Sequence, residues 1–114
     1  MNVLLNGFET KEATFRTSAT VLAKKAVALN ATGEVYYPSK GTPFTGIVAS
    51  YRDGVASVIM SGYAVATFKD TIPSVGICKL STGTAGNLEV DETNGTPYTV
   101  VGVNLTDKTI EFIL

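Results

Sequence analysis

Residues 42–60 read TPFTGIVASYRDGVASVIM, and residues 96–114 read TPYTVVGVNLTDKTIEFIL. The two stretches align without a gap at a separation of 54 residues, and they share an opening Thr-Pro-aromatic-Thr motif and a central Asp. Self-similarity at a fixed separation is the sequence signature of a duplicated structural unit. We therefore expect one fold to occur twice along this chain.

The similarity continues upstream with small changes in length. The matching pairs are Gly33-Glu34-Val35 with Gly86-Asn87-Leu88, and Val27-Ala28-Leu29 with Cys78-Lys79-Leu80. The units then span about 21–60 and 72–114, and together they form a single domain over 21–114. Residues 1–20 have no counterpart in the second unit and form an N-terminal arm.

One segment has two interpretations when it is considered alone. Ser18 to Gly33 could form a helix, with Ser18 as the N-cap, an Ala-rich body and Gly33 beyond the end. Its counterpart over 72–80 contains Pro73 and Gly76, which disfavour a helix. The repeat therefore predicts a strand at 25–29, and a helical turn near 19–24 remains the alternative.

Alternation of apolar and polar residues between turn signals predicts short strands elsewhere in the chain. Arg52-Asp53-Gly54 is a tight hairpin turn, Asp107-Lys108 holds the same place in the second unit, and Ser61-Gly62 is a third turn. The expected strands are 25–29, 34–37, 46–51, 55–60, 63–68, 75–80, 87–90, 98–104 and 109–114. This pattern predicts an all-β fold, a compact barrel or sandwich of short antiparallel strands made from the two tandem repeats.

Composition narrows the range of partners. The chain has 114 residues, 45% of them hydrophobic and 17% charged, with a formal net charge of −1. A nucleic-acid partner needs a positive stripe, and Lys24-Lys25 is the only adjacent basic pair, so we expect no nucleic-acid binding. No segment approaches the length of a membrane span, so we expect no membrane contact. The low charge favours apolar surface that is covered by other subunits.

The sequence offers no residues for a familiar active site. It contains no His, which removes Ser-His-Asp and Cys-His arrangements and the usual zinc ligand sets. The carboxylates are scattered apart from the adjacent Asp91-Glu92, and Cys78 is more typical of a small buried residue than of a nucleophile. We therefore expect no enzyme activity, no catalytic residues, no metal ligands and no cofactor.

Contact residues are the remaining candidates. The arm carries too many apolar residues for a free tail, so it either adds a strand to its own sheet or reaches a neighbouring subunit. Adjacent strand residues point to opposite faces, so one of Tyr36 and Tyr37 faces outward. The candidate subunit or capsid contacts are Leu4, Leu5, Phe8, Phe15, Arg16, Tyr36 and Tyr37.

The order of these motifs resembles a known family. The sequence runs through Lys25-Ala26-Val27-Ala28-Leu29, Gly33-Glu34-Val35, Phe44-Thr45-Gly46-Ile47-Val48-Ala49, Asp53-Gly54-Val55-Ala56-Ser57-Val58 and Ser61-Gly62-Tyr63-Ala64. It is similar to the small capsid decoration, or cement, proteins of tailed bacteriophages, to small β domains of unknown function grouped with them, and to head-fibre attachment domains. The resemblance covers about 25–80, and the repeat extends it to 86–114.

The resemblance implies a structural virion protein on the outer surface of the capsid. Such a protein binds the major capsid protein, associates with itself, often as a trimer, and stabilises the shell. An extended N-terminal arm would make capsid contacts, and residues 1–20 are the matching segment. The alternatives are another phage structural component, such as a head-fibre anchor or a tail or baseplate part, and a carbohydrate-binding β-module.

Overall fold

The strands of the chain follow one another in two sets of five. The computed structural model describes residues 10–114, so Leu4, Leu5 and Phe8 lie outside the described residues. The strands are β1 (Lys11–Arg16), β2 (Ala26–Leu29), β3 (Val35–Tyr36), β4 (Gly46–Arg52), β5 (Val55–Ser61), β6 (Tyr63–Thr67), β7 (Gly76–Thr82), β8 (Leu88–Val90), β9 (Thr96–Asn104) and β10 (Thr109–Ile113). A short 3-10 turn, η2 (Thr84–Gly86), precedes β8. The expected all-β class is confirmed.

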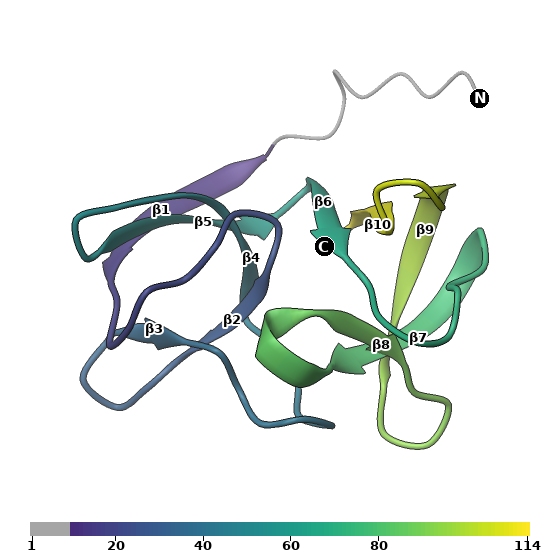
Figure 1. Cartoon of the computed structure of the whole chain (residues 1–114), viewed down its shortest axis with the longest axis horizontal. Coiled ribbons are helices and arrows are strands. Elements are labelled where there is room, and N and C mark those ends of the chain that lie inside the picture. The colour runs from purple at the N-terminus through teal and green to yellow at the C-terminus, as the bar shows by residue number, and fades with distance from the viewer. Residues whose placement is uncertain (1–9) are drawn as a thin grey trace.

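The two sets have the same topology. The first sheet has the order β1-β5-β4-β2-β3 and the second has the order β6-β10-β9-β7-β8, so each strand has its counterpart in the same place. The sheets lie side by side along the longest axis of the molecule (Figure 1). The predicted duplication is thus confirmed at the level of strand order. We call residues 11–61 the first unit and residues 63–113 the second unit.

The duplicated units begin earlier than the sequence alignment indicates. β1 pairs with β5 in the first unit as β6 pairs with β10 in the second. Residues 11–16 therefore do have a counterpart, which corrects the expectation that 1–20 stands outside the repeat. Sequence comparison missed this match because Lys11–Arg16 and Tyr63–Thr67 share only the Ala at their third and second positions, Ala13 and Ala64.

The gapless alignment is correct for the last strand of each unit and shifted for the strand before it. A two-residue turn, Asp53-Gly54, joins β4 to β5, whereas the four residues 105–108 join β9 to β10. Val48 pairs with Val58, and Val100 pairs with Phe112. The extra turn residues therefore move β9 by two positions relative to the sequence match.

The Ala-rich segment before β2 is not helical. Residues 23–24 form a turn, and β2 follows directly, as the repeat predicted. Gly33 and Gly86 both adopt a left-handed conformation, with φ of 81° and 78°, just before β3 and β8. This shared conformation, which favours glycine, explains why the sequence match extends to these two residues.

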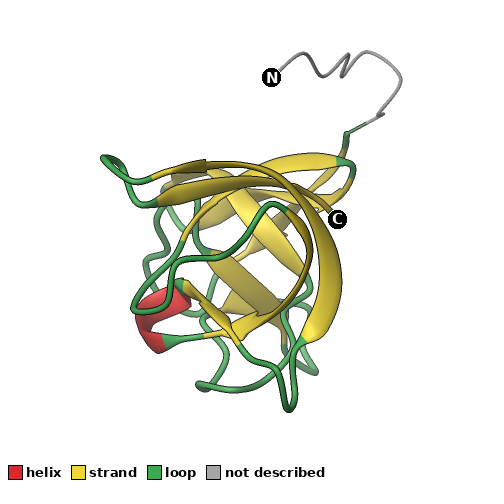
Figure 2. Ribbon diagram, turned by 90° about the vertical axis from the view of Figure 1, so that its right-hand side faces the viewer, coloured by secondary structure: helices red, strands yellow, loops and turns green. Residues whose placement is uncertain are grey.

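Each sheet curls until its edge strands approach each other. Single parallel bridges join Thr17 to Val35 in the first unit and Phe68 to Leu88 in the second. The curled strands cross in front of one another in the end view (Figure 2). The domain is therefore two small, incompletely closed barrels packed together, in keeping with the expected barrel or sandwich.

Two apolar clusters form the core. The first lies within the first unit, and its buried members are Val21, Val27, Val35, Val48, Ala56 and Val58. The second cluster combines the inner face of the second unit with Ala26, Phe44 and Ile47 from the first. Phe44, Tyr98 and Phe112 stack or meet edge-on there, with ring centres 5.2 to 6.4 Å apart. The first unit therefore inserts side chains into the core of the second.

Candidate functional site

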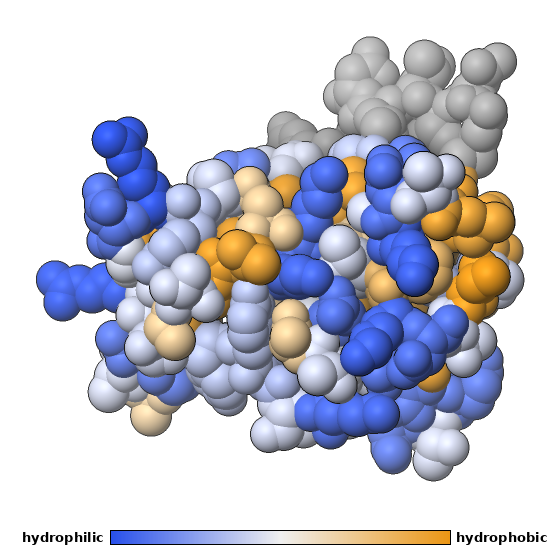
Figure 3. Space-filling view, in the orientation of Figure 1, coloured by the Kyte–Doolittle hydropathy of each residue, from blue (hydrophilic) through white to orange (hydrophobic). Residues whose placement is uncertain are grey.

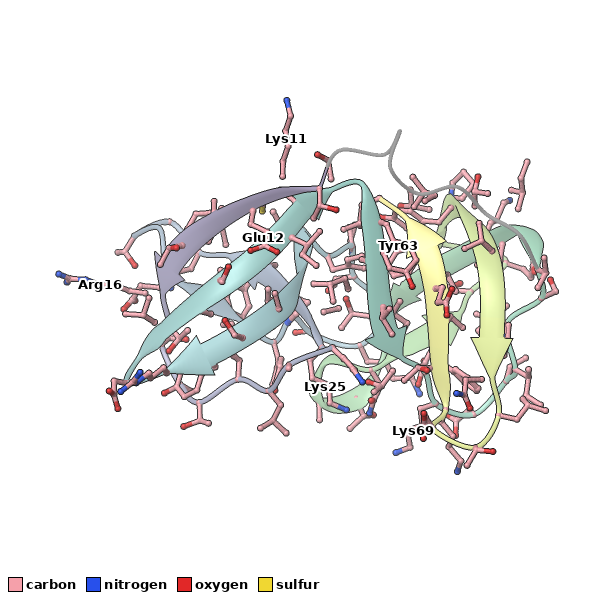
Figure 4. All side chains as sticks on the ribbon, turned by 90° about the horizontal axis from the view of Figure 1, so that it is seen from above. Lys11, Glu12, Arg16, Lys25, Tyr63 and Lys69 are labelled. Carbon is pink, nitrogen blue, oxygen red and sulfur yellow. The ribbon has the colours of Figure 1, made fainter. Side chains whose placement is uncertain are left out.

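The candidate contact residues of the first unit fall into two environments. Phe15 in β1 is half-buried and packs against the core of the first unit, whereas Arg16 is exposed. Arg16 projects from the end of the molecule farthest from the second unit (Figure 4). Phe15 is therefore a packing residue, and Arg16 is free for an external contact.

Tyr36 and Tyr37 point in different directions. Tyr36, at the end of β3, is 36% exposed. Tyr37 is half-buried against the first-unit core, and its hydroxyl accepts a hydrogen bond from the Leu22 backbone N–H at 2.7 Å. The Thr17–Val35 bridge joins the two edge strands of the first sheet. Arg16 and Tyr36 are the neighbours of these two residues and therefore lie close to the place where the edges meet. The structure thus brings Arg16 and Tyr36 to one surface of the first unit.

The most exposed apolar surface lies on the second unit, and sequence analysis did not single it out. We call it the β7 patch, and its members are Ile72, Val75, Ile77 and Leu105, which are 57%, 62%, 79% and 62% exposed. Apolar surface gathers at the right-hand end of Figure 3, where β7 begins in Figure 1. Exposed apolar clusters of this kind mark interaction sites.

A signal for the β7 patch is present in the sequence. The run Ile72-Pro73-Ser74-Val75-Gly76-Ile77 is apolar at intervals and leads into the strand predicted at 75–80. Only Pro73 in that run is buried. The outward direction follows from the register of β7, in which Cys78 and Leu80 take the inward positions and Ile77 the outward one.

An open hollow adjoins the β7 patch. It has a volume of about 470 Å³ and is lined by Phe68, Lys69, Asp70, Ile72, Leu105 and Lys108. Two lysines and one aspartate surround its apolar floor. The hollow therefore extends the apolar patch with a polar rim, which is the usual composition of a protein contact surface.

A polar network holds the two units together. The Lys25 ammonium donates hydrogen bonds to Thr67 Oγ1 at 3.0 Å and to Asn87 Oδ1 at 2.6 Å. The Thr67 hydroxyl donates to the same Asn87 oxygen, and the Thr67 N–H donates to the Lys24 carbonyl at 2.9 Å. Desolvation lowers the pKa of Lys25. This network ties the start of β2 to the end of β6.

Asp91 and two asparagines stabilise turns by accepting hydrogen bonds from backbone N–H groups. Asp91 accepts hydrogen bonds from the backbone N–H groups of Asn94 and Thr93 and from the Ser81 hydroxyl. These bonds, that from Asn94 first, lower the pKa of Asp91. Asn30 and Asn104 close turns in the same way, by accepting from the N–H two residues later.

Neither a metal centre nor a membrane helix is found in the part of the chain that the structure describes. Residues 10–114 bring together no group of three His, Cys, Asp or Glu side chains that could hold a metal ion. Within the same range, no helix has the length and apolar character to cross a membrane.

Comparison of the chain with protein-family models and with curated proteins found no match.

Proposed function

We propose that this chain is a structural virion protein that binds the outside of a phage capsid, associates with itself and stabilises the shell. The β7 patch carries the proposal, because four aliphatic side chains that are more than half exposed favour a macromolecular partner, one of them in β7 and three in the loops next to β7 and β9. The partner's identity, the major capsid protein, follows from the resemblance to decoration proteins.

Two further observations support a structural role over a catalytic one. The hydrogen-bonded polar side chains Lys25, Asn87, Asp91 and Asn104 serve in turns and in the contact between the units. The exposed groups Arg16 and Tyr36 lie on the first unit, whereas the β7 patch lies on the second. A protein with separate contact surfaces on a rigid scaffold is suited to bridge neighbouring subunits of a shell.

The aromatic residues argue against the carbohydrate-binding alternative. A sugar platform needs exposed, coplanar rings, and the most exposed ring among residues 10–114 is that of Tyr36, at 36%. Phe44, Tyr98 and Phe112 form an interior cluster instead. The other alternative, a head-fibre anchor or a tail or baseplate part, would use the same surfaces at a different place on the particle.

Co-sedimentation with capsids tests the proposal. We expect the chain to pellet with expanded capsids of its phage and to bind unexpanded procapsids more weakly, because expansion creates the outer lattice that decoration proteins occupy. Removal of residues 1–9 should weaken capsid binding, while Arg52→Ala at an exposed hairpin tip should leave it unchanged. Failure to bind either form of the capsid would overturn the proposal, and particle reconstruction would separate decoration from a tail location.

A further inference from the structure

The residues that join the two units inside the chain have equivalents, one in each unit, that lie on the surface of the molecule. Inside the chain, the start of β2 in the first unit meets β6, the first strand of the second unit. Thr67 N–H donates to the Lys24 carbonyl there, and Ala26 is completely buried. We call this the internal contact. The duplication allows each of its members to be matched to a residue elsewhere.

Register identifies the counterparts on the second unit. Ala26 lies opposite Ile47, and Ile77 lies opposite Thr99. Ile47 and Thr99 in turn lie opposite Ile59 and Ile113, which hold the same position in β5 and β10. Ile77 is therefore the counterpart of Ala26. The two residues before it, Val75 and Gly76, are the counterparts of Lys24 and Lys25.

The same reasoning identifies the counterparts on the first unit. Thr67 lies opposite Thr109, the first residue of β10, and Arg16 lies opposite Val55, the first residue of β5. Arg16 is therefore the counterpart of Thr67. Both counterpart surfaces are open, since Arg16 is exposed and Ile77 is 79% exposed.

We propose that a second copy of this chain docks head-to-tail, with the end of its β1 at Arg16 placed against Val75, Gly76 and Ile77, and so repeats the internal contact between molecules. This interface would explain the self-association that forms part of the proposed function, and the inference rests on that part of the proposed function. The contact itself involves two copies of the chain and no capsid protein.

The side chains at the two contacts are complementary in bulk. In the internal contact, Lys25 is the long cation and Thr67 is the small residue that it reaches. At the surface, Gly76 replaces Lys25 and Arg16 replaces Thr67, so the long cation moves to the other side of the contact. No heavy atom lies within 4 Å of the position that a Gly76 Cβ would occupy. That space can receive the aliphatic stem of Arg16, which would cover Val75 and Ile77.

The hydrogen-bond acceptor of the internal contact also has a polar counterpart in the first unit. Asn87 accepts from Lys25 in the internal contact, and its counterpart is Glu34. The backbone bonds Asn30 N–H to Glu34 O and Gly83 N–H to Asn87 O, at 2.9 and 2.6 Å, fix this match. Glu34 thus keeps a hydrogen-bond acceptor at this position, where its carboxylate accepts from the Thr32 hydroxyl of its own unit at 3.2 Å.

The two surfaces lie at opposite ends of the molecule. Arg16 projects from the left-hand end in Figure 4, and the β7 patch lies toward the right-hand end in Figure 3, in views that share the same horizontal axis. The longest extent of the molecule is 37 Å. One copy cannot bring its own two ends together, so a second copy is needed. Such heterologous contacts close into a ring when the rotation permits.

Disulfide trapping between two differently sized chains tests the interface in the absence of capsids. One chain carries Arg16→Cys and the other Val75→Cys, and the buried Cys78 is kept in both. On mild oxidation, we expect the mixture to form the linked heterodimer at least tenfold faster than a control mixture of Val75→Cys with Lys11→Cys. Lys11 is exposed and lies at the opposite end of β1 from Arg16.

A pair of cysteines at the equivalent positions of the internal contact shows whether this geometry permits a disulfide. Lys24→Cys with Thr67→Cys in one chain should close a disulfide within that chain, because their backbones are hydrogen bonded. If this pair closes while the Arg16 and Val75 variants link no faster than the control, the inference is overturned.

Mass in solution gives a second, independent measurement. We expect Ile77→Asp to shift the chain to the monomer by light scattering, and Leu22→Asp, at a residue 59% exposed, to leave the oligomer intact. A wild-type chain that is monomeric at high concentration yet binds capsids would overturn this interface and leave capsid decoration standing. An oligomer that never binds capsids would do the reverse.

Discussion

The two units share one strand order, yet they close their cores differently. In the first unit, Phe15 in β1 packs against the core. The corresponding residue in β6 is Ala66, and the core around it also contains Phe44 and Ile47 of the first unit. The smaller residue in β6 thus accompanies a core that includes side chains of its neighbour, whereas all members of the first core come from the first unit. Duplication preserved the topology while the packing of the two copies diverged.

We expect the largest loss of stability from a cavity in the core of the second unit, to which the first unit contributes side chains. Phe112 is fully buried and meets Phe44 and Tyr98 edge-on. We expect Phe112→Ala to lower the free energy of unfolding by about 3–5 kcal/mol in urea titrations. Its counterpart Val58→Ala should cost about 2 kcal/mol, since it removes fewer buried methyl groups. Equal losses would contradict the idea that the core of the second unit carries the contact between units.

The paired glycines test whether the seam constrains the second unit more than the first. Gly33 and Gly86 have the same left-handed conformation, but a Cβ at Gly33 would meet open space. At Gly86 the Cβ would lie 2.7 Å from the Tyr37 ring and 3.0 Å from the Lys25 Cβ.

Gly33→Ala should therefore lower the free energy of unfolding by about 1–2 kcal/mol from backbone strain alone. Gly86→Ala should lower it by a further ~1–3 kcal/mol because the seam is overpacked. Thermal unfolding of the two variants, measured side by side, gives the difference. A Gly33→Ala variant as unstable as Gly86→Ala would remove the seam as the cause.

Removal of the Lys25 ammonium tests the polar part of the seam. Lys25→Met keeps most of the aliphatic stem and removes the bonds to Thr67 and Asn87. Hydrogen bonds from a charged group contribute roughly 1.5–3 kcal/mol, and partial exposure reduces that figure, so we expect a loss of about 1 kcal/mol. Lys79→Met, at an exposed position in β7, is the control and should change stability by less than about 0.5 kcal/mol.

The smallest effect is expected in alkaline solution, from two tyrosines of the second unit. Burial raises the pKa of Tyr98, and burial followed by the charge of Glu111 raises the pKa of Tyr63, both from a usual value of 10.0. The folded chain then holds these protons at a pH where the unfolded chain releases them. Stability is therefore retained below about pH 10 and falls as the pH rises beyond it.

Tyr98→Phe should reduce this alkaline loss, whereas Tyr36→Phe on the first unit should not. The free energy of unfolding measured between pH 9 and 11 distinguishes the two variants. An alkaline loss that Tyr36→Phe abolishes and Tyr98→Phe does not would contradict the assignment to the second unit.

Local patterns were sufficient for the strands within the aligned repeats. Turn residues such as Asp53-Gly54 and the alternation around Ile110 and Phe112 predict β4, β5 and β10 close to their observed bounds. The repeat also settled the Ala-rich segment, because Pro73 and Gly76 in its counterpart are incompatible with a helix. These features depend on near neighbours in the sequence.

Features that depend on distant strands could not be predicted in the same way. β1 is recognised as part of the first unit only through its pairing with β5, to which no local motif points. The outward direction of Ile77 depends on register, since a shift by one residue would turn it inward. Arg16 and Tyr36 were selected from the sequence, but the Thr17–Val35 bridge that brings them to one surface could not be read from it.

The one-sided sharing of the core has a consequence for the order in which the chain folds. The core of the first unit is complete once Met60 has been synthesised, and none of its buried members comes from the second unit. The second core needs Phe44 and Ile47, which are already in place by then. We expect the first half to fold as it leaves the ribosome and to act as a template on which the second half condenses, so that synthesis proceeds from the self-sufficient copy to the dependent one.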